Sequence, residues 1–270
     1  MLPEKNYFLP HFSELTKTVK TTINNYTLPV AARLDSLFIF PQLDPITLVH
    51  VLYQQPSLSP NLDIVIVRFE MWKTQPAPLT TEIHKNGQAQ TLLDSFCRHQ
   101  ARINPGTDLT HPEHWDHAVL LTGYDIYHTT SSVAGVAPVG RMCDELFACS
   151  LVEGLHLGRS FVLAHEMGHN MGMVHDGVQN QCGRSCCLMS AVNGAGKTTW
   201  SSCSVREFNA FLLQMDESGR GNCLRDSSES IASIIKISNK AKILRFLGGQ
   251  EVKFLPFLAP QTKILKILRD

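Results

Sequence analysis

Hydrophobic and polar positions follow two different periods along the chain. Leu62–Trp72 is rich in β-branched and aromatic residues and predicts a strand, and the short apolar run His117–Thr122 predicts a buried strand. A glycine-punctuated extended segment follows at Val133–Val139. Helical patterns occupy four segments, which are Ile46–Tyr53, Thr91–Ile103, Phe161–Met171 and Val205–Leu213. Because strands and helices mix along the chain, the pattern predicts an α/β architecture built in layers.

Composition and net charge limit the class of protein and the partners that the chain can have. The chain has 270 residues, of which 43% are hydrophobic and 18% charged, a balance typical of a globular protein with one sizeable core. Its formal net charge is zero, which argues against nucleic acid or an anionic membrane as a partner of the whole chain. No run approaches the ~20 apolar residues of a membrane span.

The eight cysteines all lie between Cys97 and Cys223. An even number confined to one stretch predicts a disulfide framework and an oxidising compartment, so we expect a secreted, extracellular protein. A secretory signal needs roughly seven or more consecutive apolar residues, and the first 47 residues offer only Leu37–Phe40. We therefore expect that the signal peptide is missing from this sequence.

The segment HEMGHNMGMVHDG begins at His165 and contains two histidines four residues apart. On a helix, His165 and His169 lie about 40° apart on one face, so both imidazoles can reach a single metal ion. Glu166 is offset from His165 by about 100° and flanks that ion. This is the position of a general base that acts on a metal-activated water.

A third histidine, His175, comes six residues after His169. In a continuing helix it would lie roughly 9 Å further along the axis, out of reach of the same ion. Gly172 permits a turn, because glycine adopts positive φ at little cost. Three histidines with an open fourth position predict a catalytic Zn²⁺ site. A solvated helix that merely carries histidines is the alternative, and the combined spacing favours zinc.

The pattern HExxHxxGxxHD, which Asp176 completes, resembles the active-site motif of the adamalysin branch of the metzincin metallopeptidases. Met189 in the following CLMS segment fits the turn methionine of that branch. Further stretches resemble the catalytic domain of the ADAM-with-thrombospondin-motifs (ADAMTS) family, namely YQQPSL at 53–58, DIVIVR at 63–68, LLDSFCRHQARINP at 92–105, EHWDHAVLLTGYDI at 113–126, GVAPVGRMC at 135–143, WSSCS at 200–204 and GNCLRD at 221–226. The resemblance implies a zincin fold with a mixed, mostly parallel sheet, long helices, an active-site helix and a Met-turn.

The resemblance also implies a function, that of a zinc-dependent endopeptidase acting on extracellular or matrix proteins. His165, His169 and His175 would hold the Zn²⁺, and Glu166 would be the general base that acts on zinc-activated water. The substrate would lie extended against an edge strand near Ser132–Val139. The alternative is a catalytically inactive, truncated or decoy binding module of the same fold. The intact Glu166 argues against that alternative, and the lack of a matching first strand argues for it.

Disulfide pairing is implied by the same resemblance. The implied bonds join Cys97 to Cys149, Cys143 to Cys223, and Cys182 to Cys203. Two cysteines remain, Cys186 and Cys187. They bond each other, bond elsewhere, or shift the register of the other pairs.

A structural Ca²⁺ site is implied as well. Asp116 and Asp226, with the backbone carbonyl of Cys223, match its ligands, and Asp108 is a further candidate. Hard carboxylate and carbonyl oxygens suit Ca²⁺. Without the family, the stretch 108–117 reads as a polar surface loop, or as a second zinc cluster because of its histidines. The resemblance favours calcium.

Three regions are expected. Residues 1–47 are an unmatched N-terminal segment, interpreted as a propeptide remnant or a gene-model artefact, and residues 48–226 are the metallopeptidase catalytic domain. Residues 227–270 form a cysteine-free tail with eight Lys or Arg against three Asp or Glu. We expect this basic tail to be poorly ordered, with an amphipathic helix on a membrane surface as the alternative.

Protein substrates are the expected partners, and membrane association is not expected. Residues 191–198 resemble the end of a phosphate-binding loop, but Ala191 stands where the first glycine is required and no buried strand precedes it. We therefore expect no nucleotide partner.

Overall fold

The computed structural model describes residues 45–72, 75–105, 114–129, 131–154, 158–192, 197–218, 222–224 and 261–269. The chain divides into two units, 1–43 and 44–270, and every described residue belongs to the second. The unmatched segment 1–47 lies almost entirely outside the described residues, as do Asp108, Asp226 and most of the tail 227–270.

Helices and strands mix along the described chain, which confirms the α/β prediction. The helical elements are α3 (Pro45–Tyr53), η2 (Ala77–Leu79), α4 (Thr81–His84), α5 (Ala89–Ile103), α6 (Arg159–Asn170) and α7 (Ser202–Glu217). The strands are β1 (Leu62–Met71), β2 (His117–Thr122), β3 (Tyr127–His128), β4 (Ser131–Ser132), β5 (Gly135–Val136), β6 (Cys149–Glu153) and β7 (Gln261–Arg269). Among the described helices, none combines the length and apolar character that crossing a membrane requires.

Within the described residues, the main sheet has the strand order β1-β7-β2-β6-β5. Strands β2 and β6 pair in parallel, and the other neighbouring pairs are antiparallel. Strands β1, β2 and β6 therefore run in the same direction, but only one neighbouring pair is parallel. The predicted mostly parallel sheet differs from the observed pairing because β7 lies between β1 and β2. Strand β5 forms the opposite edge of the sheet.

The expectation of a poorly ordered tail stays a prediction, because the structure describes only residues 261–269 of the segment 227–270, as strand β7. This strand pairs with β1 from Leu62 opposite Arg269 to Met71 opposite Gln261, and with β2 on its other side. The physical reason for this pairing is non-local, because a strand between two others satisfies backbone groups that both neighbours would otherwise leave unpaired. The sequence of the tail contains no information about these distant partners.

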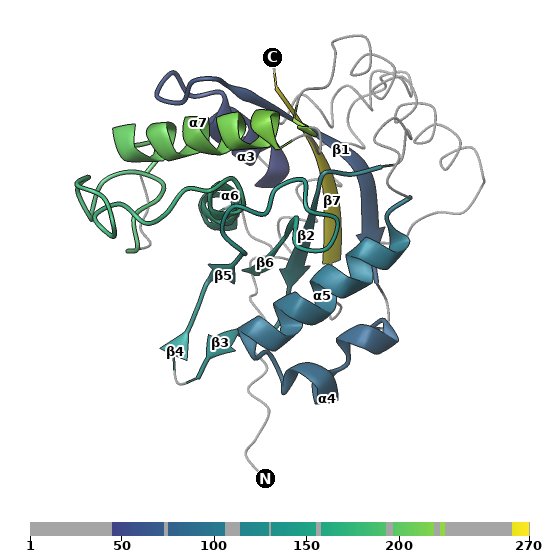
Figure 1. Ribbon diagram of the computed structural model, residues 1–270. Helices are drawn as coiled ribbons and strands as arrows, with labels where there is room; N and C mark the ends of the chain where they lie inside the picture. Colours follow the sequence, from purple (N-terminus) through teal and green to yellow (C-terminus); the bar gives the residue numbers. More distant parts are fainter. Residues whose placement is uncertain are drawn as a thin grey trace, which may run out of the picture. The chain divides into compact units, whose positions relative to one another are not determined.

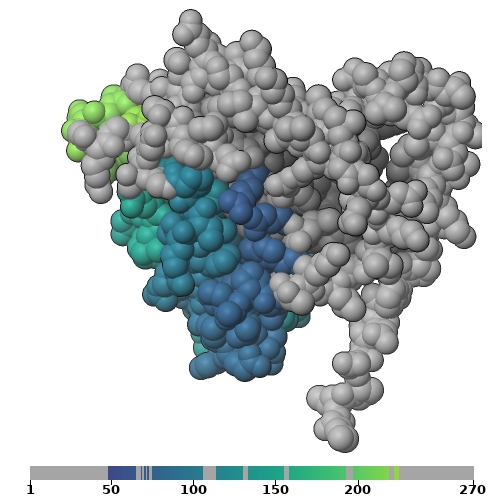
Figure 2. Space-filling view, turned by 90° about the vertical axis from the view of Figure 1, so that its right-hand side faces the viewer, coloured from purple at the N-terminus to yellow at the C-terminus, as the bar shows by residue number. Residues whose placement is uncertain are grey.

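Strand β2 is buried along its whole length and separates two hydrophobic cores. Val119 and Leu121 belong to one core together with residues of α3, α6 and α7. Ala118 and Leu120 belong to the other core together with residues of α5. Successive side chains of a strand point to opposite faces, so the sheet is a middle layer with helices on both sides (Figure 1). In the space-filling view, the blue and teal segments, which include α4 and α5, form the surface on one side (Figure 2).

The eight cysteines form four disulfides. Three of them are the pairs that the family resemblance implies, Cys97–Cys149, Cys143–Cys223 and Cys182–Cys203. The remaining two, Cys186 and Cys187, bond each other. The Cys97–Cys149 bond joins α5 to β6 and so fixes the helix to the sheet.

Candidate metal centre

Helix α6 places the first two histidines of the motif on one buried face. His165 is 7% exposed, and its ring centroid lies 4.7 Å from that of His169. The imidazole Nδ1 of His165 lies 2.7 Å from the carbonyl oxygen of Leu188. The Nδ1 of His169 lies 2.8 Å from the carbonyl oxygen of Met173. Backbone carbonyls thus fix the orientation of both rings.

A sharp helix end brings the third histidine back to the first two. Helix α6 ends at Asn170, and Gly172 follows with φ of 86°. The amide of Met173 donates to the carbonyl of Gly168 at 3.0 Å, and that of Gly172 donates to the carbonyl of His169 at 2.9 Å. This is the Schellman arrangement, in which a glycine in the left-handed region ends the helix. The chain reverses there as the spacing predicts.

The Nε2 atoms of the three histidines converge on one point. His175 Nε2 lies 3.0 Å from His165 Nε2 and 3.1 Å from His169 Nε2. A carbonyl oxygen only accepts, so the Nδ1 atoms of His165 and His169 carry the protons and their Nε2 atoms present lone pairs. They face His175 Nε2, and in the tautomer with its proton on Nδ1 His175 adds a third lone pair to this group. The donor set therefore fits a metal ion, and three imidazoles suit Zn²⁺.

The protonation states agree with this interpretation. Burial and, to a smaller extent, the neighbouring His169 lower the pKa of His165 to about 3. Burial lowers the pKa of His169 to about 4, although its hydrogen bond to Met173 acts in the opposite direction. Burial also lowers the pKa of His175. All three rings are neutral near pH 7, which is the form that binds metals.

Glu166 lies between the histidine cluster and the free edge of the sheet. It is 6% exposed, and burial raises the pKa of its carboxyl group to about 8 in the absence of a metal. A Cβ atom added to Gly135 of strand β5 would stand 2.7 Å from Glu166 Oε1. The carboxyl group therefore contacts the backbone of the edge strand.

The loop that carries Met189 packs against helix α6 and against the segment that carries His175. Met189 is fully buried, and its sulfur would stand 2.7 Å from a Cβ atom added to Gly168 of α6. The carbonyl of Met189 accepts a hydrogen bond from the amide of Asp176 at 2.8 Å. The carboxylate of Asp176 accepts from the hydroxyl of Ser201. Both the helix and the segment of His175 are thus attached to this loop, as expected of a Met-turn.

The described part of the chain does not test the predicted calcium ligands as a group. Asp116 is buried at 4% exposure, and Cys223 is bonded to Cys143. Asp226 and Asp108 lie outside the described residues. Among the residues that the structure describes, the three histidines alone form a group whose ligand atoms could hold a metal. The calcium site stays a prediction, and residues 193–196 of the loop that resembles a phosphate-binding motif are not described.

Sequence reasoning missed three contributors to the site. The carbonyls of Leu188 and Met173 orient the imidazoles, and a backbone atom leaves no trace in a residue pattern. Gly135 allows the edge strand to approach Glu166. The glycine at the start of the extended segment was a usable signal for a close backbone approach.

Comparison with known proteins places this geometry in a family. A family model described as Reprolysin (M12B) family zinc metalloprotease matches residues 42–227. The chain belongs to this family. Its reprolysin domain therefore includes all the elements described above except β7.

Two relatives of the reprolysin domain are similar in sequence. A disintegrin and metalloproteinase with thrombospondin motifs adt-1 of Caenorhabditis elegans is 68% identical over 267 residues, which cover 85% of this chain and 18% of the relative. A disintegrin and metalloproteinase with thrombospondin motifs 6 of Homo sapiens is 36% identical over 197 residues, which cover 67% of this chain and 17% of the relative. The chain thus spans less than a fifth of the length of these relatives.

Among solved structures, the archaemetzincin of Methanopyrus kandleri matches with a TM-score of 0.34 and 20% identity, over 52% of this chain and 73% of that one. A zinc-dependent peptidase from Methanocorpusculum labreanum matches with a TM-score of 0.28 and 15% identity, over 62% of this chain and 80% of that one.

Proposed function

We propose that this reprolysin domain is a zinc-dependent endopeptidase in which His165, His169 and His175 hold the metal and Glu166 is the general base. The observation that carries the proposal is the convergence of three neutral imidazoles next to a buried carboxyl group, with His175 Nε2 at 3.0 Å from His165 Nε2 and 3.1 Å from His169 Nε2. Family membership supports a zinc metalloprotease. The assignment of individual roles rests on the geometry.

The residues of the chain divide the chemistry between them. When bound, Zn²⁺ supplies a Lewis acid that polarises the scissile carbonyl and makes water more acidic. Glu166 accepts a proton from the attacking water and delivers it to the departing amine. The carbonyls of Leu188 and Met173 keep the imidazole rings in the orientation and tautomer that ligation requires.

The substrate is a polypeptide that extends along strand β5. Among the described strands, β5 pairs only with β6, so its outer edge can pair with an added strand. Gly135 of this edge contacts Glu166, so a peptide bound there passes the general base. Four disulfides support an extracellular location, and the ADAMTS relatives support extracellular or matrix proteins as substrates.

The test compares wild type with Glu166→Gln for zinc content and for cleavage of denatured matrix protein, with and without a chelator. Glu145→Gln, an identical change at an exposed position, is the matched control. We expect one equivalent of zinc in all three proteins and chelator-sensitive cleavage by wild type and the control alone. Zinc binding without cleavage by wild type would instead identify an inactive binding module. Folded protein without zinc would overturn the metal site itself.

A further inference from the structure

We propose that Asn170 is a positioning residue, whose side-chain amide fixes the distance between the substrate-binding edge of the sheet and the metal-binding helix. This inference rests on the proposed function, because it concerns how a peptide bound along β5 is aligned with the metal centre and Glu166. Nothing in the HExxH pattern itself assigns a role to this position.

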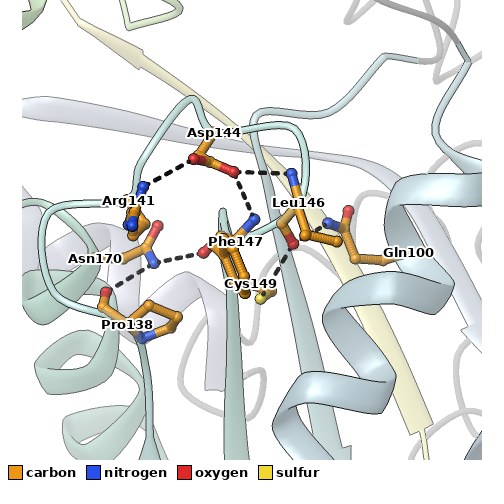
Figure 3. A network of polar contacts seen from close by, with 8 residues as sticks. All are labelled: Gln100, Pro138, Arg141, Asp144, Leu146, Phe147, Cys149 and Asn170. Carbon is orange, nitrogen blue, oxygen red and sulfur yellow. Dashed lines mark hydrogen bonds and ion pairs between the residues drawn. The ribbon is translucent and has the colours of Figure 1, made fainter.

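The amide group of Asn170 bridges two separate points of one segment. Asn170 is the last residue of α6, follows His169 directly and is fully buried. Its Nδ2 donates to the carbonyl of Pro138 at 3.1 Å and to that of Phe147 at 3.0 Å (Figure 3). Pro138 follows edge strand β5 closely, and Phe147 closely precedes β6. One side chain of the metal-binding helix thus holds both ends of the connection between two neighbouring strands.

Backbone contacts show that this connection crosses the end of α6. The amide of Gly140 donates to the carbonyl of His169 at 2.8 Å, and the amide of Met142 donates to that of Asn170 at 2.8 Å. These two bonds hold the middle of the connection. Pro138, which continues the edge on which the substrate would pair, has no amide proton to donate and is held to the helix through its carbonyl.

Packing on the other side of this segment is incomplete. An open pocket of about 180 Å³ lies between α5 and the segment, and Val136, Pro138 and Phe147 line it on the segment side, opposite Leu93 of α5. Because this pocket is open to solvent, α5 makes fewer packing contacts with the segment here than a filled interface would. The position of the edge next to the metal centre therefore depends on the two hydrogen bonds of the Asn170 side chain together with the two backbone bonds to the end of α6.

A second buried amide provides a matched control. Gln100 of α5 is 1% exposed and donates to the carbonyl of Leu146 at 3.2 Å (Figure 3) and to that of Glu145 at 3.2 Å. It therefore holds the same connection through the same chemistry, with two backbone carbonyls as acceptors. It differs from Asn170 because α5 carries no residue of the metal centre, and because its Oε1 also accepts a hydrogen bond from Trp115 Nε1 at 2.8 Å. A purely structural role predicts equal effects of the two substitutions on turnover.

The first measurement compares Asn170→Ala with Gln100→Ala in the full zinc-loaded chain, with a peptide substrate long enough to pair with β5. We expect both variants to lower the melting temperature. For Asn170→Ala we expect kcat to fall by about 10- to 100-fold with KM changed less than about threefold, because a misplacement of about 1 Å can cost ~10²-fold in rate. For Gln100→Ala we expect kcat within about threefold of wild type. Equal loss of kcat in both variants would overturn the proposal.

A binding measurement decides the matter if wild type does not cleave peptides. Acetohydroxamate probes the metal alone, and a peptide hydroxamate probes the metal and the strand edge together. In wild type the peptide part should strengthen binding, and Asn170→Ala should reduce that gain by about tenfold while leaving the affinity for acetohydroxamate unchanged. Gln100→Ala should retain the full gain. If Asn170→Ala does not fold, Asn170→Ser, which keeps one donor, takes its place. An undiminished gain in the Asn170 variant, or no gain in wild type, would overturn the role of Asn170.

Discussion

Gly135 and Glu166 are in such close contact that a single added methyl group would collide with the carboxyl group. The collision would involve Oε1 at 2.7 Å, Cγ at 2.8 Å and Val162 Cγ1 at 2.9 Å. A strand of the sheet and a helix of the metal centre therefore meet through a residue without a side chain. The approach of the substrate edge to the general base depends on this contact.

Gly135→Ala should lower kcat/KM by about 10- to 100-fold, because either Glu166 or the edge strand must move. Zinc content should not change, since the three atoms nearest to the added methyl group belong to Glu166 and Val162 and not to a histidine. The control is Gly123→Ala, at a position where an added Cβ atom has no neighbour within 4 Å. Kinetics and metal analysis of the two variants check the prediction, and full activity of Gly135→Ala would contradict the contact.

Gly172→Ala should destabilise the fold and weaken zinc binding together. Its φ of 86° costs an L-residue about 1–2 kcal/mol, and an added Cβ atom would stand 3.1 Å from Phe211 Cβ. His175 follows this turn, so a shifted turn moves the third ligand. Gly172→Asn should lose less stability, because asparagine tolerates the left-handed region better. Urea unfolding and a competitive zinc titration test both effects, and equal stability of the alanine variant and wild type would be incompatible with the observed turn.

His117 should make the protein sensitive to acid. Burial lowers the pKa of this core histidine to about 3, although the Asn170 side chain opposes the shift. The unfolded chain binds a proton at His117 below about pH 6.5 and the folded chain does not, so stability is retained above that pH and declines as the pH falls towards 3. Between pH 7.5 and 5.5, wild type should lose about 1.4 kcal/mol more unfolding free energy than His117→Gln. The comparison cancels the contributions of the other buried histidines, and parallel pH curves would refute it.

Removal of residues 261–270 should destabilise the reprolysin domain severely. Strand β7 pairs with the edge strand β1 on one side and with β2 on the other, so its loss leaves unpaired backbone groups on both of these strands. We expect loss of the cooperative melting transition and faster proteolysis of β1. A synthetic peptide with the sequence QTKILKILR should restore part of the transition. An unaltered melting curve would exclude β7 from the sheet.

The metal centre could be predicted from the sequence because its information is local. His165, His169, Gly172 and His175 lie within eleven consecutive residues, and helix geometry converts that spacing into positions. Strand β2 could also be predicted from the sequence, because a continuous apolar run is stable only when it is buried on both faces.

What could not be predicted depends on contacts between distant segments. The apolar residues of β7 are interrupted by lysines in a pattern that also suits a helix, and pairing with β1 and β2 decides its conformation. The role of Asn170 was hidden for a similar reason. Its acceptors are the carbonyls of Pro138 and Phe147, and their identity as residues says nothing about where their backbone oxygens point.

The position of β7 also has a consequence for the synthesis of the protein. Met71 at the end of β1 and Gln261 at the start of β7 are 190 positions apart. At translation rates of about 5–20 residues per second, β1 emerges from the ribosome roughly 10–40 s before the strand that joins it to β2. During that interval the nascent chain displays two apolar strands that lack their common neighbour. We therefore expect the growing polypeptide to bind chaperones in the compartment where it is made.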